Sequence, residues 1–286
     1  MLPLRAAMWL AAAVAALVIR LDRRRRRIGL TNLAIAFPEK SERERAAILA
    51  ASCRNLGRMV AECAHLAWLT PTNVRAVIGF ENEEFWRCEV VQPLATSGVL
   101  ILTGHFGNWE LCAYAHGLLG HPVHLVHRTI NNPLVDAFVE RLRRRGGTRL
   151  LRKHSAARAV LGALRDRGLM VLPLDQNASR RTGIFVNFFG QPASTNAGFA
   201  RVALITGVPV VPAFLVREGI SPRHRIVILP RVQIASMADR EQAVRELTQA
   251  CAVVLEDMIR RYPDHWLWTH RRWRTRPLGE PEIYDV

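Results

Sequence analysis

Lysine, paired cysteines and repeated segments are scarce or missing in this sequence of 286 residues. The five cysteines are dispersed and no two form a CxxC pair, which excludes a disulfide framework and a cysteine zinc site. No internal repeat or low-complexity linker interrupts the chain, so a repeat architecture is excluded. Half of the residues are hydrophobic, which also excludes a chain that is disordered throughout.

Positive charge is abundant, and arginine carries almost all of it. Only Lys40 and Lys153 are lysines, although the net charge is +16. Such a charge indicates an anionic partner, which can be nucleic acid, an anionic membrane face or a phosphorylated substrate.

The N-terminus carries an apolar run at residues 6–19, between Arg5 and Arg20, and five consecutive arginines follow at 23–27. The run is shorter than the roughly 20 residues of a full membrane span. Because the charge lies mainly behind the run, it is typical of an uncleaved anchor with the following domain on the cytoplasmic side. We expect residues 1–27 to be an anchor with its basic flank and residues 28–286 to be one domain. A buried alanine-rich core helix is the alternative.

The rest of the chain alternates between helical and extended patterns. A capping box at Ser41 and Glu44 predicts a long amphipathic helix that ends near Trp68. The expected strands are 98–103, 122–126, 169–174, 208–215 and 225–229, and the expected helices are 109–119, 133–145, 156–167, 197–205 and 239–262. This order predicts an α/β fold with a central, largely parallel mixed sheet flanked by helices. Ligands of such sheets bind at the carboxyl ends of strands, where His105 and Asp175 are expected.

His105 and Glu110 form the most informative pair of residues. Five positions along one ideal helix would turn them apart by about 140°. They can meet only if His105 lies in a loop, which Gly104 and Gly107 make easy, and Glu110 lies in the first helical turn. A neutral imidazole can then take the proton of a hydroxyl that attacks a thioester, while a carboxylate on the other ring nitrogen stabilises the imidazolium.

Plainer interpretations of this pair stay open. His105 can be a turn residue, and Glu110 can be a solvated acid at the start of a helix. A metal site is a weaker interpretation, because the segment lacks the i, i+4 histidine pair of a helical zinc site. We expect no metal and no redox cofactor.

The segment HFGNWE resembles the HxxxxD/E motif of the lysophospholipid acyltransferase superfamily. It looks like the branch that contains the late, lauroyl- and myristoyl-type, acyltransferases of lipid A biosynthesis. The segments that carry this resemblance lie in family order at 27–33, 37–39, 105–110, 127–128, 132–134, 175–176, 188–190, 266–273 and 276–277.

The resemblance implies a glycerol-3-phosphate acyltransferase-like domain behind an N-terminal anchor in the inner membrane, facing the cytoplasm. The donor would be an acyl thioester of acyl carrier protein or of CoA, and the acceptor a hydroxyl of a phosphorylated lipid A precursor. His105 and Glu110 would be the catalytic pair. The expected substrate-binding residues are Gly107, Asn108, Arg128, Asp175 and Gln176.

Several of these residues also have structural interpretations. Arg128 can contact a substrate phosphate or pair with Asp136 or Glu140. Asp175 and Gln176 can cap the loop that follows their strand. Asn108 is more typical of a helix N-cap than of a substrate ligand.

The basic and aromatic C-terminal segment is ambiguous in the same way. Trp266, Trp268 and Trp273 can form an interfacial belt or pack into the core. The arginines at 141–145 and 271–276 are typical of solvated faces, and they also suit an anionic membrane surface.

Other functions remain as alternatives. The same chemistry can act on another membrane lipid, such as a phosphatidylinositol mannoside or an amino-acid lipid. A basic nucleic-acid-binding protein would be expected to lack the apolar N-terminal run, and a non-catalytic membrane-surface protein would not need an intact His–Glu pair.

Overall fold

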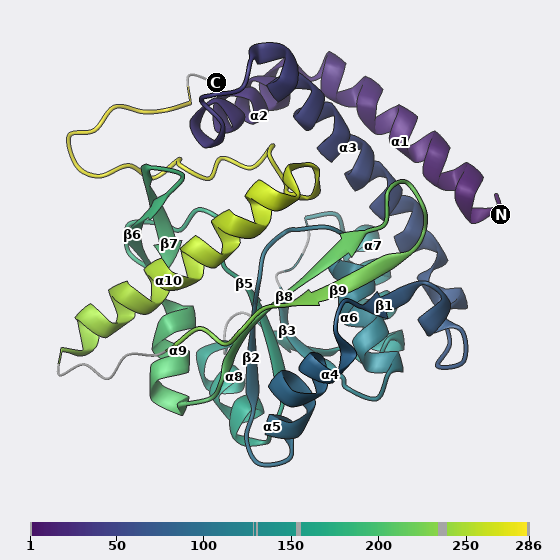
Figure 1. Ribbon diagram of the computed structural model, residues 1–286, viewed down its shortest axis with the longest axis vertical. Coiled ribbons are helices and arrows are strands. Elements are labelled where there is room, and N and C mark those ends of the chain that lie inside the picture. The colour runs from purple at the N-terminus through teal and green to yellow at the C-terminus, as the bar shows by residue number, and fades with distance from the viewer. Residues whose placement is uncertain (1, 128, 130, 153–155, 234–238, 285–286) are drawn as a thin grey trace.

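A seven-stranded mixed sheet forms the centre of the molecule, with helices on both of its faces (Figure 1). The computed structural model describes residues 2–127, 129, 131–152, 156–233 and 239–284. The strand order is β1-β9-β8-β2-β5-β3-β4, and all neighbouring strands are parallel except the antiparallel pair of β8 and β9. The α/β fold class predicted from the sequence is therefore confirmed.

The elements alternate along the chain as the sequence pattern indicates. The strands are β1 (Ile78–Phe80), β2 (Val99–Thr103), β3 (Val123–His127), β4 (Arg149–Arg152), β5 (Leu169–Pro173), β6 (Gly183–Phe188), β7 (Gln191–Asn196), β8 (Val210–Arg217) and β9 (His224–Ile228). The helices are α1 (Leu4–Leu21), α2 (Arg23–Ala36), α3 (Glu42–His65), α4 (Glu83–Trp86), α5 (Gln92–Leu94), α6 (Trp109–Leu118), α7 (Pro133–Arg145), α8 (Ala156–Arg165), α9 (Gly198–Thr206) and α10 (Arg240–Arg261), with short 3-10 turns such as η5 (Pro263–His265).

Some elements were not expected. The two-stranded hairpin of β6 and β7 lies beside the main sheet against α10 (Figure 1). Its second strand contains Pro192 and several small polar residues, which are atypical of a strand, and Phe189 and Gly190 turn the hairpin with positive φ. The edge strands β1 and β4 and the helices α2, α4 and α5 were also missed.

Long-range hydrogen bonds fix the C-terminal segment on α2. The Asn32 side chain is fully buried, and its Nδ2 donates to the carbonyl oxygens of Trp268 and His270, both at 2.7 Å. The three C-terminal tryptophans are fully buried as well, so they form part of the core and not an interfacial belt. Near the end of the segment, the Tyr284 hydroxyl donates a hydrogen bond to Asn32 Oδ1 at 2.6 Å.

Helix α1 lies antiparallel along α3 on the outside of the domain (Figure 1). Gly57 of α3 packs against the Ala11 backbone. At the C-terminal end of α3, Nε2 of His65 hydrogen-bonds to the carbonyl oxygen of Leu2. Among the described residues, α1 is the one helix long and apolar enough to cross a membrane by length and composition. It buries one side on α3 and exposes an apolar face that includes Trp9 and Leu17, 74% and 55% exposed. Such an exposed face suits a lipid surface.

We expect the double substitution Trp9→Ser/Leu17→Ser to weaken binding to anionic phospholipid vesicles. Burying one large apolar side chain is worth about 1.5–3 kcal/mol, so the partition coefficient should fall at least about tenfold. Vesicle flotation measures it. The matched control, Ile205→Ser/Val253→Ser, removes two half-exposed apolar side chains from α9 and α10 and should leave partitioning unchanged. Equal losses in both variants would contradict a membrane role for α1.

Candidate active site

The pairing of β2 with β5 brings His105 and Asp175 together. Thr103 and Pro173 are register partners at the carboxyl ends of these parallel strands, and the Leu174 N–H donates to the Thr103 carbonyl at 3.0 Å. His105 and Asp175 each lie two residues beyond the end of their strand. Gly104 permits this approach, because a side chain there would have its Cβ 3.2 Å from the Asp175 Cβ and Cγ.

The Asp175 carboxylate is almost fully buried and accepts three hydrogen bonds. The backbone N–H of His105 and the indole Nε1 of Trp266 donate to Oδ2, each at 2.9 Å. The imidazole Nδ1 of His105 lies 2.9 Å from Oδ1. Because a carboxylate only accepts, Nδ1 carries the ring proton and Nε2 is left with a lone pair.

Electrostatics make the histidine a stronger base. Burial by itself lowers the pKa of His105, but the charge and hydrogen bond of Asp175 outweigh burial, and the net shift of the pKa is upward. Burial raises the pKa of Asp175, but the charge and hydrogen bonds of His105 outweigh that, and the pKa falls to about 2. Asp175 is therefore an ionised partner at neutral pH.

Gln176 lies next to the reactive nitrogen. Its exposed amide Nε2 is 3.3 Å from His105 Nε2. On the other side, the ring of Trp109 packs edge-on against the imidazole, with 5.2 Å between the centroids. A hydroxyl that replaced the Gln176 amide would meet the lone pair of Nε2.

Glu110 has a different partner from the one expected. Arg143 of α7 donates from Nε and Nη2 to the two Glu110 oxygens, at 2.9 and 2.5 Å. Arg143 Nη1 also donates to His127 Nδ1, at 3.1 Å, and His127 Nε2 contacts Asp136. In the structure the carboxylate on the Nδ1 of His105 is thus Asp175 and not Glu110, which its own ion pair holds away. A catalytic role for Glu110 stays a prediction.

Gly107 and Asn108 shape the loop between His105 and α6. Gly107 has φ of +59°, a Cβ there would lie 1.9 Å from the Leu215 carbonyl oxygen, and its N–H donates to the His265 carbonyl. Asn108 is fully buried and caps α6 by accepting from the Leu111 N–H at 2.9 Å, as expected. Their predicted contact with substrate stays a prediction, and Arg128 lies outside the described residues.

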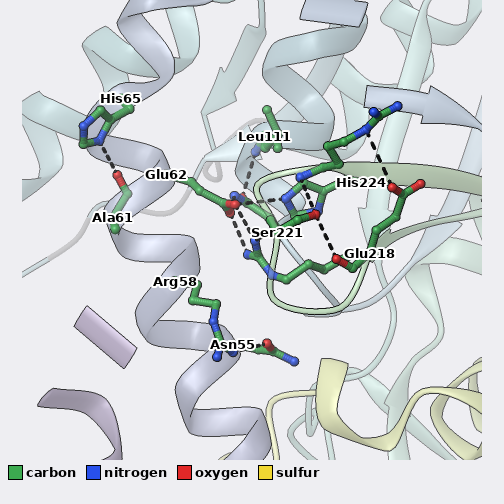
Figure 2. Close-up of polar contacts among 12 residues, drawn as sticks. Asn55, Arg58, Ala61, Glu62, His65, Leu111, Glu218, Ser221 and His224 are labelled. Atoms are coloured by element: carbon green, nitrogen blue, oxygen red, sulfur yellow. Dashed lines mark hydrogen bonds and ion pairs between the residues drawn. The ribbon is translucent and has the colours of Figure 1, made fainter. Parts of the chain in front are cut away.

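A buried network of charged side chains contacts the end of this loop, where α6 begins (Figure 2). Glu62 of α3 points toward His224, and its Oε1 accepts from Arg217 Nη1 and His224 Nε2, at 2.5 and 3.1 Å. Its Oε2 accepts from Arg217 Nη2 and Asn108 Nδ2, both at 2.7 Å. Arg217 also donates to the Ser221 carbonyl. The network therefore joins α3, the end of β8 and the start of α6.

Glu62 is ionised in this network. Burial raises its pKa, but the hydrogen bonds and charges of Arg217 and His224 outweigh burial, and the pKa falls to about 2. Burial lowers the pKa of His224, so its ring is neutral and donates from Nε2. Sequence reasoning missed these residues, since a single glutamate in an amphipathic helix gives no sign that it faces inward.

An apolar cavity of about 320 Å³ opens beside His105. Its polar lining residues include His105, Glu110, Arg143 and Gln176. The rest is lined mainly by apolar side chains of the sheet and of α6, among them Ile101, Ala113, Val123, Leu125, Leu169 and Ala213. A long aliphatic group fits such a lining. Within the described residues, no cluster of His, Cys, Asp and Glu could hold a metal ion.

We expect Glu62→Gln to lower the free energy of unfolding by about 3–5 kcal/mol, because it leaves Arg217 buried without a counter-charge. The new amide nitrogen is itself a donor. At the position of Oε2 it would face the donors Asn108 Nδ2 and Arg217 Nη2. Urea unfolding in detergent measures this change. The matched control is Glu83→Gln, which breaks the exposed Arg75–Glu83 pair and should cost less than about 1 kcal/mol. Equal costs would show that Glu62 does not hold the loop.

Comparisons with known proteins identify the family of the chain. The profile of the bacterial lipid A biosynthesis acyltransferases matches residues 1–275. The chain is 28% identical to a lipid A biosynthesis palmitoleoyltransferase of Escherichia coli K12 over 263 residues, 92% of this chain and 83% of the relative. It is also 28% identical to a lauroyltransferase of that strain over 273 residues, 94% of this chain and 85% of the relative.

A third relative is a lipid A biosynthesis myristoyltransferase of the same strain. It is 24% identical over 267 residues, which cover 93% of this chain and 80% of the relative. The profile thus extends over nearly the whole chain and includes helix α1, the His105 loop and most of the C-terminal segment. The chain belongs to the family of bacterial lipid A biosynthesis acyltransferases.

Proposed function

We propose that this enzyme transfers a fatty acyl group from an acyl thioester, carried by acyl carrier protein, to a hydroxyl of a phosphorylated lipid A precursor. One observation carries the proposal: His105, whose Nδ1 is paired with a buried carboxylate and whose Nε2 has only the exposed Gln176 amide beside it, lines an apolar cavity. The names of the relatives favour lipid A over the other membrane lipids as the acceptor.

His105 acts as the general base in this proposal. Its Nε2 takes the proton of the acceptor hydroxyl while the hydroxyl oxygen attacks the thioester carbonyl. The tetrahedral intermediate then expels the thiolate, which takes the proton back from Nε2, so the products are an ester and a free thiol. Asp175 holds the Nδ1 proton throughout and stabilises the imidazolium by its charge.

Glu110 acts through Arg143. The two side chains line the cavity, and Glu110 fixes the guanidinium by two hydrogen bonds. A guanidinium there can stabilise the negative charge that develops on the carbonyl oxygen. In this proposal Gly107 and Asn108 maintain the conformation of the loop. Gln176 contacts the acceptor.

The acyl chain occupies the apolar cavity. The lining residues on the sheet and α6 belong to a buried cluster that includes Ile101, Ala113 and Val123. A chain in this cavity therefore leaves water and keeps its thioester carbon beside His105.

The enzyme works at the cytoplasmic face of the inner membrane, held by residues 1–27. Helix α1 packs along α3, which carries Arg54, Asn55 and Arg58, so a full span by α1 would draw these polar residues into the hydrocarbon. Helix α1 therefore lies in the interface, with its exposed apolar face in the lipid.

We expect His105→Ala to lower kcat by about 10²- to 10⁴-fold, the usual effect of removing a positioned base. Asp175→Asn should also lower kcat and should move the acidic limb of the pH–rate profile to lower pH. The reason is that Asp175 raises the pKa of His105, and only the neutral ring is active. Acyl transfer to a lipid A precursor measures both effects.

Glu110→Gln tests the second carboxylate. It weakens the ion pair with Arg143 without touching Nδ1, so kcat should fall with little change in the acidic limb. His105→Ala/Glu110→Gln should be slower than His105→Ala, because Arg143 can still stabilise the developing charge after the base is lost. A shift of the acidic limb in Glu110→Gln but not in Asp175→Asn would reverse the two roles. Near-normal transfer by well-folded His105→Ala would refute the mechanism.

We expect Ala113→Leu to shift the acyl preference toward shorter chains. The larger side chain fills part of the cavity, and each methylene that no longer fits costs about 1–3 kcal/mol in kcat/KM. Competition between acyl thioesters of different length measures the ratio of rates, which does not depend on the folded fraction. The control Ala203→Leu enlarges a fully buried alanine of α9 that does not line the cavity, and it should keep the wild-type ratio.

A further inference from the structure

A second cavity, of about 470 Å³, lies between the start of α2 and the C-terminal segment. Gln176 lines this cavity and the acyl cavity alike, so the two are neighbours at Gln176, whose amide lies 3.3 Å from His105 Nε2. Its charged and titratable lining residues are Asp22, Arg24, Arg25, His270, Arg271 and Arg274.

The lining carries excess positive charge. Asp22 is its one carboxylate among the described residues, and it pairs with Arg25 at 3.3 Å and caps α2. Arg24 and Arg274 are exposed, and within the described part of the chain neither has a carboxylate within ion-pairing distance. Two guanidinium groups are therefore available to an anion.

His270 adds a neutral donor. Its Nε2 accepts from the Asn177 backbone N–H at 3.0 Å, so the ring proton is on Nδ1. Burial lowers the pKa of His270 to about 4, which keeps the ring neutral near pH 7. Within the described residues, Nδ1 makes no hydrogen bond to protein, and His270 lines the cavity.

The cavity is preformed. Asn32 of α2 bonds the carbonyl groups of Trp268 and His270 and fixes the two walls to each other. Arg272 is fully buried and donates to the carbonyl oxygens of Gln176 and Ser194, at 3.3 and 2.8 Å. An anion can thus bind without first ordering the walls.

We propose that this cavity binds a phosphate group of the acceptor lipid, with Arg24, Arg274 and the Nδ1–H of His270 as donors. The inference rests on the proposed function, since it places the acceptor headgroup where its hydroxyl reaches Nε2 of His105 past Gln176. Arginine is suited to phosphate because its planar donors match the phosphate oxygens.

The position relative to the membrane agrees with a lipid headgroup. Arg24 and Arg25 lie in the first turn of α2, directly after α1 and its exposed apolar face. A lipid whose chains lie beside α1 therefore has its headgroup at the level of this cavity.

The test is acyl transfer by the full chain in neutral detergent, with a phosphorylated lipid A precursor and its phosphatase-treated form as acceptors. Arg24→Gln/Arg274→Gln should raise KM for the phosphorylated acceptor about tenfold, with a smaller change in kcat, because a phosphate contact supplies binding in ground and transition states alike. The preference for the phosphorylated form should fall accordingly, and KM for the thioester donor should stay unchanged. The matched control, Arg158→Gln/Arg165→Gln, removes two exposed arginines from α8, far from α2 (Figure 1). It should keep the wild-type preference.

The outcomes separate this inference from the proposed function. Wild-type enzyme that transfers nothing to either acceptor refutes the proposed function. Active wild-type enzyme with an unchanged preference in the Arg24/Arg274 variant refutes the phosphate site alone. An equal loss in the α8 control shows a general charge effect, and a raised KM for the donor places the donor's phosphate in the cavity; either result overturns the inference.

Discussion

Parallel pairing of β2 with β5 is the constraint on which the rest of the site depends. It delivers His105 and Asp175 to the same edge of the sheet, where a buried carboxylate orients the loop backbone, the imidazole and the indole of Trp266 at once. An ionised carboxylate in such a place is stable only when its acceptor sites are filled. The ring of His105 is therefore part of what stabilises Asp175, and the tautomer needed for a base follows from a structural requirement.

A second buried carboxylate, that of Glu62, also needs its acceptor sites filled, and it contacts the other end of the loop. Glu62 satisfies Arg217, His224 and Asn108 together, and Asn108 begins the helix that follows His105. The loop is thus held at one end by Asp175 and at the other by Glu62. Both carboxylates have a pKa of about 2, so both anchors stay charged over the physiological range. Rigidity of this kind keeps the His105 imidazole in one position.

Much of this could be predicted from the sequence, and the limits have physical causes. The α/β pattern, the cap of Asn108 and the strand-end positions of His105 and Asp175 follow from local periodicity and turn chemistry. The bond between His105 and Asp175 does not, because strand order is a property of the whole sheet. Glu110 was expected on the imidazole, but the packing of α6 against α7 supplies Arg143 as a nearer partner. The burial of the C-terminal tryptophans depends equally on distant contacts.

Helix α1, the His105 loop and the second cavity belong to one continuous structure. Helix α1 packs on α3, and α3 carries the glutamate that holds the His105 loop. Helix α2 carries arginines of the second cavity, and its Asn32 holds the C-terminal segment that forms the opposite wall. In the proposed arrangement, the depth of α1 in the lipid therefore also sets the height of both cavities above it. In that arrangement, a lipid acceptor can keep its acyl chains in the bilayer and reach His105 from the side, so its hydrophobic part never has to cross water.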